Sequence, residues 1–175
     1  MRTIEPIAKL DLAFSLFCLQ HKFSWPVSRL SKAVSHTGDG HLYVLFGALA
    51  WGWGGDTGAW FLLAGLTAFL IELPIYWTLK NLFKRRRPQE LSDLVPSFIT
   101  PSDRYSLPSG HTAAAFLIAT LIGHFYPGLA VIALVWACFI ALSRILLGVH
   151  FLTDVLLGAV LGMMCAQAAL TLIGG

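Results

Sequence analysis

The sequence has few charged residues and few cysteines. Charged side chains make up 12% of its 175 residues, whereas soluble domains carry about 25%. The three cysteines, Cys18, Cys138 and Cys165, stand alone without C-x-x-C spacing, so neither a zinc site nor a disulfide framework is indicated. The low charge also excludes a disordered chain and a coiled coil, because both depend on many charged residues.

Hydrophobic residues are correspondingly abundant. They account for 57% of the sequence, against about 45–50% in soluble domains, and the mean hydropathy is +0.72. A soluble globule of this length could not bury so much apolar surface and keep a polar shell. The sequence therefore predicts an integral membrane protein and excludes an ordinary cytosolic enzyme. Its length predicts a single domain over residues 1–175.

Long apolar runs predict where the chain crosses the membrane, because a spanning helix needs about 20 mostly apolar residues. Such runs are 59–79, 128–147 and 153–173, and two shorter runs, 41–55 and 112–126, suffice if flanking residues extend them. We therefore expect an all-α fold, a polytopic membrane helix bundle of five to six transmembrane helices.

Residues 1–40 leave the helix count open. The segment 5–21 is apolar but carries Lys9 and Asp11, so it either lies in the membrane interface or crosses as a sixth helix. Residues 22–40 hold small and polar residues that predict an interfacial helix followed by a turn near Asp39.

The connections between the apolar runs differ in polarity. Two of them are tight turns, at 54–56 and at 126–128, whereas the connection 80–110 is long and basic. Alternating crossings place this connection on the same membrane face as the region 143–154. We therefore expect one active site at one membrane face, built from residues 80–111 and 143–154.

Polar residues with the chemistry of a binding site gather in these two regions. Ionisable groups at the ends of membrane helices are costly, so their convergence on one face indicates a functional site. They form three clusters: Lys80 with Arg87 and Pro88, then Pro108, Ser109, Gly110 and His111, then Ser143, Arg144, His150 and Asp154.

The cations and the Ser-Gly pair predict an anion site. Lys80, Arg87 and Arg144 are fixed cations, and the planar fork of arginine matches phosphate oxygens. Ser109 and Gly110 precede an apolar helical run, where free N–H groups and the helix dipole favour an anion. The predicted ligand is a small oxyanion that carries several charges.

The remaining polar residues predict chemistry on that anion. His150 and Asp154 are four positions apart on one helix face, so the carboxylate can accept a hydrogen bond from one imidazole nitrogen. The other nitrogen is then free to attack phosphorus, and His111 can give a proton to the leaving alcohol. A phosphohistidine would form, and water would hydrolyse it.

The order and spacing of the clusters resemble the three-part signature of the type 2 phosphatidic acid phosphatase family. The resemblance covers residues 80–154, and every motif position is filled in order. It implies a helical membrane bundle, usually of six helices, that removes phosphate from lipid phosphates or diphosphates without a metal ion or cofactor. The substrates that it implies are phosphatidylglycerol phosphate, undecaprenyl diphosphate and phosphatidic acid.

The resemblance also implies roles for residues and partners. It makes His150 the nucleophile, Asp154 its orienting partner and His111 the acid. The partners that we expect are a phosphorylated membrane lipid and the bilayer, with no nucleic acid, and the sequence gives no oligomeric state. The residues that would hold the phosphate are Lys80, Arg87, Ser109, Gly110 and Arg144.

Other functions share these residues. His111, His150 and Asp154 could hold iron, but three nearby cations would repel a divalent ion. The signature also occurs in vanadate-dependent haloperoxidases, which are soluble, and the hydrophobicity of this chain argues against that function. A lipid phosphotransferase with the same intermediate stays open. A non-enzymatic lipid transporter or scaffold predicts lost catalytic residues, and none is lost.

Charged and titratable residues outside the motifs have simpler interpretations. Lys84, Arg85 and Arg86 are interpreted as an anchor for anionic headgroups. Glu72 is interpreted as a partner for a cation of the site or for a neighbouring helix. Packing or interface positions are expected for the remaining histidines, His21, His36, His41 and His124.

Two opposed considerations bear on the orientation in the membrane. The positive-inside rule puts the basic connection 80–110 in the cytoplasm, whereas the family resemblance puts the active face of bacterial members toward the periplasm. Because the motif cations have a catalytic explanation, we expect a multi-pass protein of a bacterial inner membrane with its active site facing the periplasm.

Overall fold

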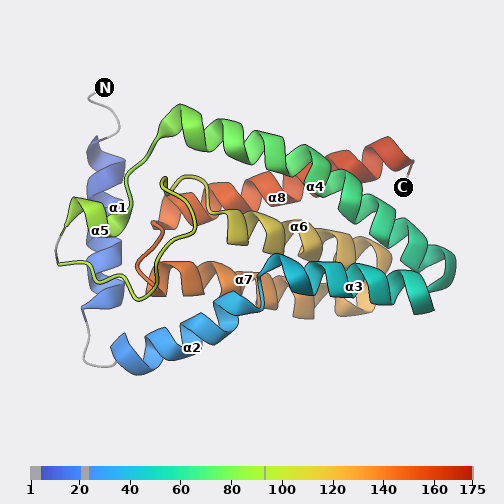
Figure 1. Cartoon of the computed structure of the whole chain (residues 1–175), viewed down its shortest axis with the longest axis horizontal. Coiled ribbons are helices and arrows are strands. Elements are labelled where there is room, and N and C mark those ends of the chain that lie inside the picture. The colour runs from blue at the N-terminus through green and yellow to red at the C-terminus, as the bar shows by residue number, and fades with distance from the viewer. Residues whose placement is uncertain (1–4, 21–23, 93, 175) are drawn as a thin grey trace.

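The fold is all-helical over the residues that the structure describes, as the sequence predicts. The computed structural model describes residues 5–20, 24–92 and 94–174, and each regular element among them is a helix (Figure 1). The elements are α1 (Glu5–Leu19), α2 (Ser24–His36), α3 (Gly40–Trp53), α4 (Gly55–Phe83), α5 (Pro88–Leu91), α6 (Gly110–Phe125), the 3-10 turn η1 (Pro127–Leu129), α7 (Ala130–Leu146) and α8 (Leu152–Ile173).

Among the described residues, three helical stretches are long and apolar enough to cross a membrane. They are Gly55–Leu91, Pro127–Leu146 and Leu152–Ile173, and each overlaps one of the three long runs in the sequence. The two shorter runs correspond to α3 and α6, which have 14 and 16 residues. At a rise of about 1.5 Å per residue, these two helices are roughly 21 and 24 Å long.

The helices fall into two orientations (Figure 1). Helices α3, α4, α6, α7 and α8 run along the long axis of the molecule, whereas α1 lies across their ends, and α2 meets α3 at an angle. The described part of the segment 5–21 therefore does not run parallel to the bundle. Residue His21, for which packing or an interface position is expected, lies outside the described residues.

Close packing of α6 against α8 depends on two glycines. A Cβ on Gly158 would lie 2.6 Å from the carbonyl oxygen of Ser109, and a Cβ on Gly162 would lie 2.0 Å from that of Ala113. Both distances are too short for any side chain, and the spacing is the small-xxx-small pattern of membrane helix contacts. The two backbones therefore touch, and the start of α6 is fixed against the first half of α8.

The outer surface of the bundle is apolar. Leu66 and Leu70 on α4 are 62% and 74% exposed, and Val131 on α7 is 74% exposed. A continuous exposed surface of this kind is unfavourable in water but matches the acyl chains of a bilayer. The surface therefore agrees with the membrane protein that the composition predicts.

The segments that carry the three clusters meet at one end of the bundle (Figure 1). The loop 92–109 is held there against the link 147–151 between α7 and α8, because the Phe98 N–H donates to the Leu147 carbonyl at 3.1 Å. A Cβ on Gly148, whose φ is +73°, would lie 2.0 Å from the Pro96 carbonyl oxygen. This position therefore requires glycine.

Candidate active site

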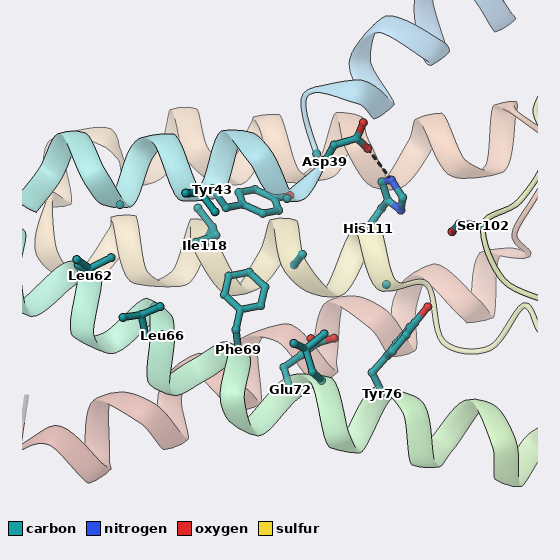
Figure 2. Close-up of a pocket in the computed structure, with 18 of the residues that line it drawn as sticks. Asp39, Tyr43, Leu62, Leu66, Phe69, Glu72, Tyr76, Ser102, His111 and Ile118 are labelled. Atoms are coloured by element: carbon teal, nitrogen blue, oxygen red, sulfur yellow. Dashed lines mark hydrogen bonds and ion pairs between the residues drawn. The ribbon is translucent and has the colours of Figure 1, made fainter.

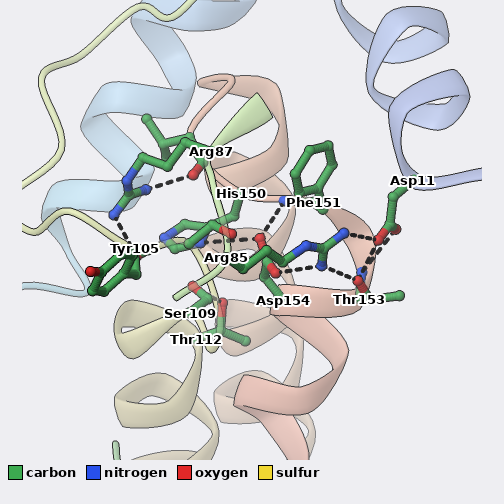
Figure 3. Close-up of polar contacts among 12 residues, drawn as sticks. Asp11, Arg85, Arg87, Tyr105, Ser109, Thr112, His150, Phe151, Thr153 and Asp154 are labelled. Carbon is green, nitrogen blue, oxygen red and sulfur yellow. Dashed lines mark hydrogen bonds and ion pairs between the residues drawn. The ribbon is translucent and has the colours of Figure 1, made fainter. Parts of the chain in front are cut away.

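The eight residues that the sequence singles out lie at this end of the bundle and are mostly buried. Several different elements supply them, so the site forms only when the bundle is assembled. They are Lys80 near the end of α4, Arg87 before α5, Ser109, Gly110 and His111 at the start of α6, Arg144 near the end of α7, His150 in the link and Asp154 in the first turn of α8. Figure 3 shows four of them, Arg87, Ser109, His150 and Asp154.

His150 and Asp154 lie side by side without the hydrogen bond that the sequence predicts. The His150 Nδ1 atom is 3.7 Å from Asp154 Oδ2, and this nitrogen has no hydrogen-bond partner among the described residues. Asp154 Oδ2 accepts the backbone N–H of Phe151 at 2.8 Å instead. Asp154 is the third residue of α8, where a carboxylate caps the first turn of a helix.

Burial sets the protonation state of His150. The residue is 3% exposed, and its burial lowers the pKa of the imidazole to about 4, because a charged ring would lose its hydration. Asp154 opposes this shift, while Arg144 and Arg87 add to it. At neutral pH the imidazole is uncharged and carries a lone pair, which is the form that a nucleophile needs.

This lowered pKa predicts that acid destabilises the folded protein through His150. Between pH 6.5 and pH 4 the unfolded chain binds a proton at this residue and the folded chain does not, so stability falls as the pH falls. We expect acidification from pH 7 to pH 4.5 to lower the free energy of unfolding of the wild type by about 2 kcal/mol more than that of His150→Gln. Unfolding in detergent at both pH values measures this, and equal losses would contradict it.

Arg85 belongs to the site rather than to the surface (Figure 3). Its guanidinium donates to Asp154 Oδ1 at 2.7 Å and to Asp11 Oδ2 at 2.6 Å. The interpretation of Arg85 as a headgroup anchor is therefore wrong, because its charge is used between two carboxylates of the fold. The pairing ties α1 to the first turn of α8, whereas Lys84 and Arg86 are exposed.

Lys80 and Arg87 converge on a carboxylate that the sequence analysis did not single out. Lys80 Nζ donates to Asp103 Oδ1 at 2.7 Å, and Arg87 Nη2 donates to the same oxygen at 2.5 Å. Tyr76 donates its hydroxyl to the other oxygen, Asp103 Oδ2, at 2.7 Å. Arg87 also donates to the carbonyl oxygen of Val149 at 2.6 Å. The fold thus brings the two cations together and pairs them with an internal anion.

Arg144 is only partly paired. Its Nη1 donates to Ser35 Oγ at 2.6 Å, but its buried Nε has no partner among the described residues. The side chain lines the same cavity as His111 and His150. Because buried polar groups are normally hydrogen-bonded, this N–H indicates that a ligand in the cavity completes its bonding.

Ser109 and Gly110 are tightly packed at the start of α6. The Ser109 N–H donates to the backbone carbonyl of Asp154 at 3.0 Å, and the Ser109 hydroxyl accepts a hydrogen bond from Thr112 at 2.9 Å. A Cβ on Gly110 would lie 2.9 Å from the Tyr76 ring, so packing as well as ligand access explains this glycine. The N–H groups of the first turn itself have no acceptor within the helix and can meet an anion.

His111 has a carboxylate partner that the sequence analysis missed (Figure 2). Its Nε2 lies 3.0 Å from Oδ1 of Asp39, in the turn between α2 and α3, and Asp39 Oδ2 lies 2.6 Å from Nδ1 of His36. Burial raises the pKa of Asp39, but the bonds to the two histidines outweigh burial and hold it below its usual value. His36, for which a packing or interface position is expected, therefore also contacts the carboxylate that lies beside His111.

A cavity of about 780 Å³ joins this charged cluster to an apolar wall (Figure 2). The wall is formed mainly by α3 and α4, and Glu72 of α4 also lines the cavity. The residues at the charged end are Arg87, Asp103, His111, Arg144 and His150, and those of the apolar wall include Tyr43, Leu62, Leu66, Phe69 and Ile118.

The geometry does not assemble the iron ligands considered above. Over the part of the chain that the structure describes, no group of three His, Cys, Asp or Glu side chains is arranged to hold a metal ion. His111 and His150 instead face different carboxylates, Asp39 and Asp154. Each histidine thus has its own acidic neighbour.

Sequence comparison finds relatives of this chain among lipid phosphatases. The family model of the PAP2 superfamily matches residues 58–174. A probable lipid phosphate phosphatase beta from Arabidopsis thaliana is 30% identical over 139 residues, which cover 63% of this chain and 64% of that protein. A decaprenylphosphoryl-5-phosphoribose phosphatase from Mycolicibacterium smegmatis is 40% identical over 101 residues, 55% of this chain and 51% of that one. The matches thus span about half to two thirds of these relatives.

Two solved structures share the fold over nearly the whole chain. LpxE from Aquifex aeolicus superposes with a TM-score of 0.80 at 26% identity, covering 93% of this chain and 95% of that one. A transmembrane PAP2 type phosphatidylglycerolphosphate phosphatase from Bacillus subtilis superposes with a TM-score of 0.74 at 26% identity, covering 97% and 87%.

Proposed function

The chain belongs to the PAP2 superfamily, and from this premise we propose that it is a lipid phosphatase that forms a phosphohistidine at His150. The observation that carries the proposal is the cavity that runs from the motif residues to an apolar wall. Its charged end fits a phosphate, and its wall fits the hydrocarbon part of the same molecule. A water-soluble phosphate ester has no hydrocarbon chain to pack against that wall.

In the first half-reaction His150 attacks phosphorus. Its Nδ1 faces Asp154 at 3.7 Å, so Nε2 forms the new N–P bond while the bond between phosphorus and the lipid oxygen breaks. His111 gives its proton to the leaving oxygen. Asp154 stabilises the positive charge that the imidazole acquires. The products are a lipid alcohol and the phosphohistidine; a lipid diphosphate would release the lipid monophosphate instead.

In the second half-reaction water attacks the phosphohistidine. His111, which is now neutral, takes a proton from that water, the N–P bond breaks, and inorganic phosphate leaves. His150 returns to its neutral form. Asp39, whose Oδ1 is 3.0 Å from His111 Nε2, holds the His111 ring in place while it donates and then accepts the proton.

The phosphoryl oxygens are stabilised by donors from three segments. Arg144 supplies its unpaired Nε, the first turn of α6 supplies N–H groups beside Ser109 and Gly110, and Lys80 and Arg87 supply charge. These donors act on the oxygens that carry the negative charge in the transition state, which is the main requirement of phosphoryl transfer.

Phosphate release by the purified protein in detergent tests the proposal. The candidate substrates are phosphatidylglycerol phosphate, undecaprenyl diphosphate and phosphatidic acid, each assayed with excess EDTA. We expect release from at least one lipid at a rate that EDTA does not change. Transfer of phosphate to an added acceptor lipid, in place of release, would identify a lipid phosphotransferase. No turnover of any of the three lipids would contradict the proposal and favour a non-enzymatic lipid protein.

We further propose that α3, α4, α6, α7 and α8 span the membrane and that the active site faces the periplasm of a bacterial inner membrane. Burial supports this orientation: Lys80, Arg87 and Arg144 are each at most 5% exposed, so they are not free loop charges of the kind that the positive-inside rule counts.

Cysteine labelling in intact cells tests the orientation. Thr100→Cys lies at the active-site end and Asp56→Cys at the start of α4, and both positions are exposed. In a chain without the three native cysteines, an impermeant reagent is expected to label Thr100→Cys and to leave Asp56→Cys unlabelled. The reverse pattern would place the active site in the cytoplasm.

A further inference from the structure

Asp103 lies between the cavity and the buried cation Lys80, and beside Arg87, which also lines the cavity. The side chains of Lys80 and Arg87 are 2% exposed, whereas that of Asp103 is 20% exposed. Asp103 lines the cavity, and Lys80 is not among the cavity-lining residues. An anion that enters the cavity therefore meets the Asp103 carboxylate before it reaches Lys80.

The Asp103 carboxylate makes the contacts expected of a bound phosphate. Its Oδ1 accepts hydrogen bonds from Lys80 at 2.7 Å and Arg87 at 2.5 Å, and its Oδ2 accepts one from Tyr76 at 2.7 Å. Burial raises the pKa of Asp103, but the bonds from Lys80 and Tyr76 outweigh burial and keep it below its usual value. The carboxylate is therefore an anion bonded to the two cations that the proposed function assigns to the substrate's phosphate.

We propose that Asp103 is a specificity-determining residue, which occupies the phosphate position until a doubly charged phosphate displaces it and so excludes singly charged phosphodiester lipids. This inference rests on the proposed phosphate site. The displacement is local, because Arg87 also donates to the main-chain carbonyl of Asp103 at 3.1 Å. Rotation of the side chain frees both cations while that backbone contact stays.

Charge decides which lipids can make the exchange. A phosphate monoester carries about −1.5 to −2 at pH 7, so replacing the single charge of Asp103 with it strengthens the attraction to Lys80 and Arg87. A phosphodiester carries a single charge, so its attraction to Lys80 and Arg87 is no stronger than that of the carboxylate that it must displace. The bilayer presents such diesters in large excess, with tails that suit the same apolar wall. Without Asp103 they would compete with the substrate.

The variant Asp103→Asn tests this proposal, since it keeps the shape of the side chain and removes its charge. We expect inorganic phosphate to bind the variant about tenfold more tightly than the wild type in calorimetry, because no internal anion competes. We also expect phosphatidylglycerol, a singly charged diester, to inhibit hydrolysis of phosphatidic acid in mixed micelles by the variant and not by the wild type.

Two further variants serve as a second test and as a control. Tyr76→Phe removes one donor to Asp103 and leaves both cations in place, so it should shift phosphate binding in the same direction by a smaller factor, even if Asp103→Asn fails to fold. Glu90→Gln, an exposed carboxylate of α5, removes a charge outside the site and should bind phosphate like the wild type.

The direction in which Asp103→Asn changes phosphate affinity shows whether Asp103 selects among lipids or only positions the two cations. If Asp103 only positions Lys80 and Arg87, Asp103→Asn will bind phosphate more weakly, which overturns the proposal. Equal inhibition of both proteins by phosphatidylglycerol also overturns it. A third combination of results is possible: Asp103→Asn binds phosphate more tightly, but the wild type releases phosphate from none of the lipids. That combination would support this inference and refute the proposed function.

Discussion

His150→Ala is expected to lose at least about 10³-fold in phosphate release from any lipid that the wild type hydrolyses. In the proposed mechanism the substitution removes the nitrogen that bonds to phosphorus, so water would have to attack the lipid phosphate directly. The cations proposed to bind the phosphate remain, and substrate binding should change little. Phosphate release in detergent with excess EDTA measures the loss. Brief incubation with radiolabelled lipid should label the wild type through an acid-labile bond and leave His150→Ala unlabelled.

His124→Ala is the matched control for this experiment. His124 is exposed near the end of α6, away from the clusters, so its removal should leave both activity and labelling unchanged. Substantial turnover by His150→Ala, or a label that survives in it, would show that another group attacks phosphorus.

His111→Gln is expected to lose about 10²–10⁴-fold with lipid phosphates, and the loss should depend on the leaving group. An alkyl oxygen needs a proton to leave, whereas p-nitrophenolate leaves readily without one. With p-nitrophenyl phosphate the loss should therefore be at least roughly tenfold smaller. His150→Ala provides the contrast, because it removes the attacking atom and should lose activity equally with both substrates.

The partner of His111 offers a graded version of this test. Asp39→Asn keeps the acid but loosens a contact of 3.0 Å to its Nε2, so it should show the same leaving-group pattern with a smaller loss. Asp56→Asn, which removes an exposed carboxylate at the other end of α4, should leave both substrates unaffected. Equal losses with lipid and aryl substrates in His111→Gln would show that His111 does not protonate the leaving oxygen in the rate-limiting step.

The sequence is sufficient to predict the helices and the motif residues because both depend on local signals. An apolar run of about 20 residues commits a segment to the bilayer whatever its neighbours are, and each of the three long runs overlaps a candidate span. The relation of His150 to Asp154 does not follow from the helical repeat expected from the sequence, because His150 lies in the link before α8, which begins at Leu152. Their missing hydrogen bond could not be predicted either, because the Phe151 N–H takes the carboxylate oxygen.

The partners of the motif residues could not be predicted in this way. Asp39 and His111 are 72 positions apart, and Asp103 lies 23 positions from Lys80. Only the packing of α2, α4 and the loop 92–109 at one end of the bundle brings these groups into contact. Arg85 was misjudged for the same reason, since a basic run in isolation is typical of a headgroup anchor.

The contact between α6 and α8 has a consequence for how this protein can evolve. Gly158 and Gly162 leave no room for a side chain, so mutation cannot alter that crossing without moving Ser109 relative to Asp154. Helix α3, which supplies part of the apolar wall, precedes the family match at 58–174. Substitutions in α3 can therefore reshape the apolar wall without disturbing the contact that fixes Ser109 against Asp154.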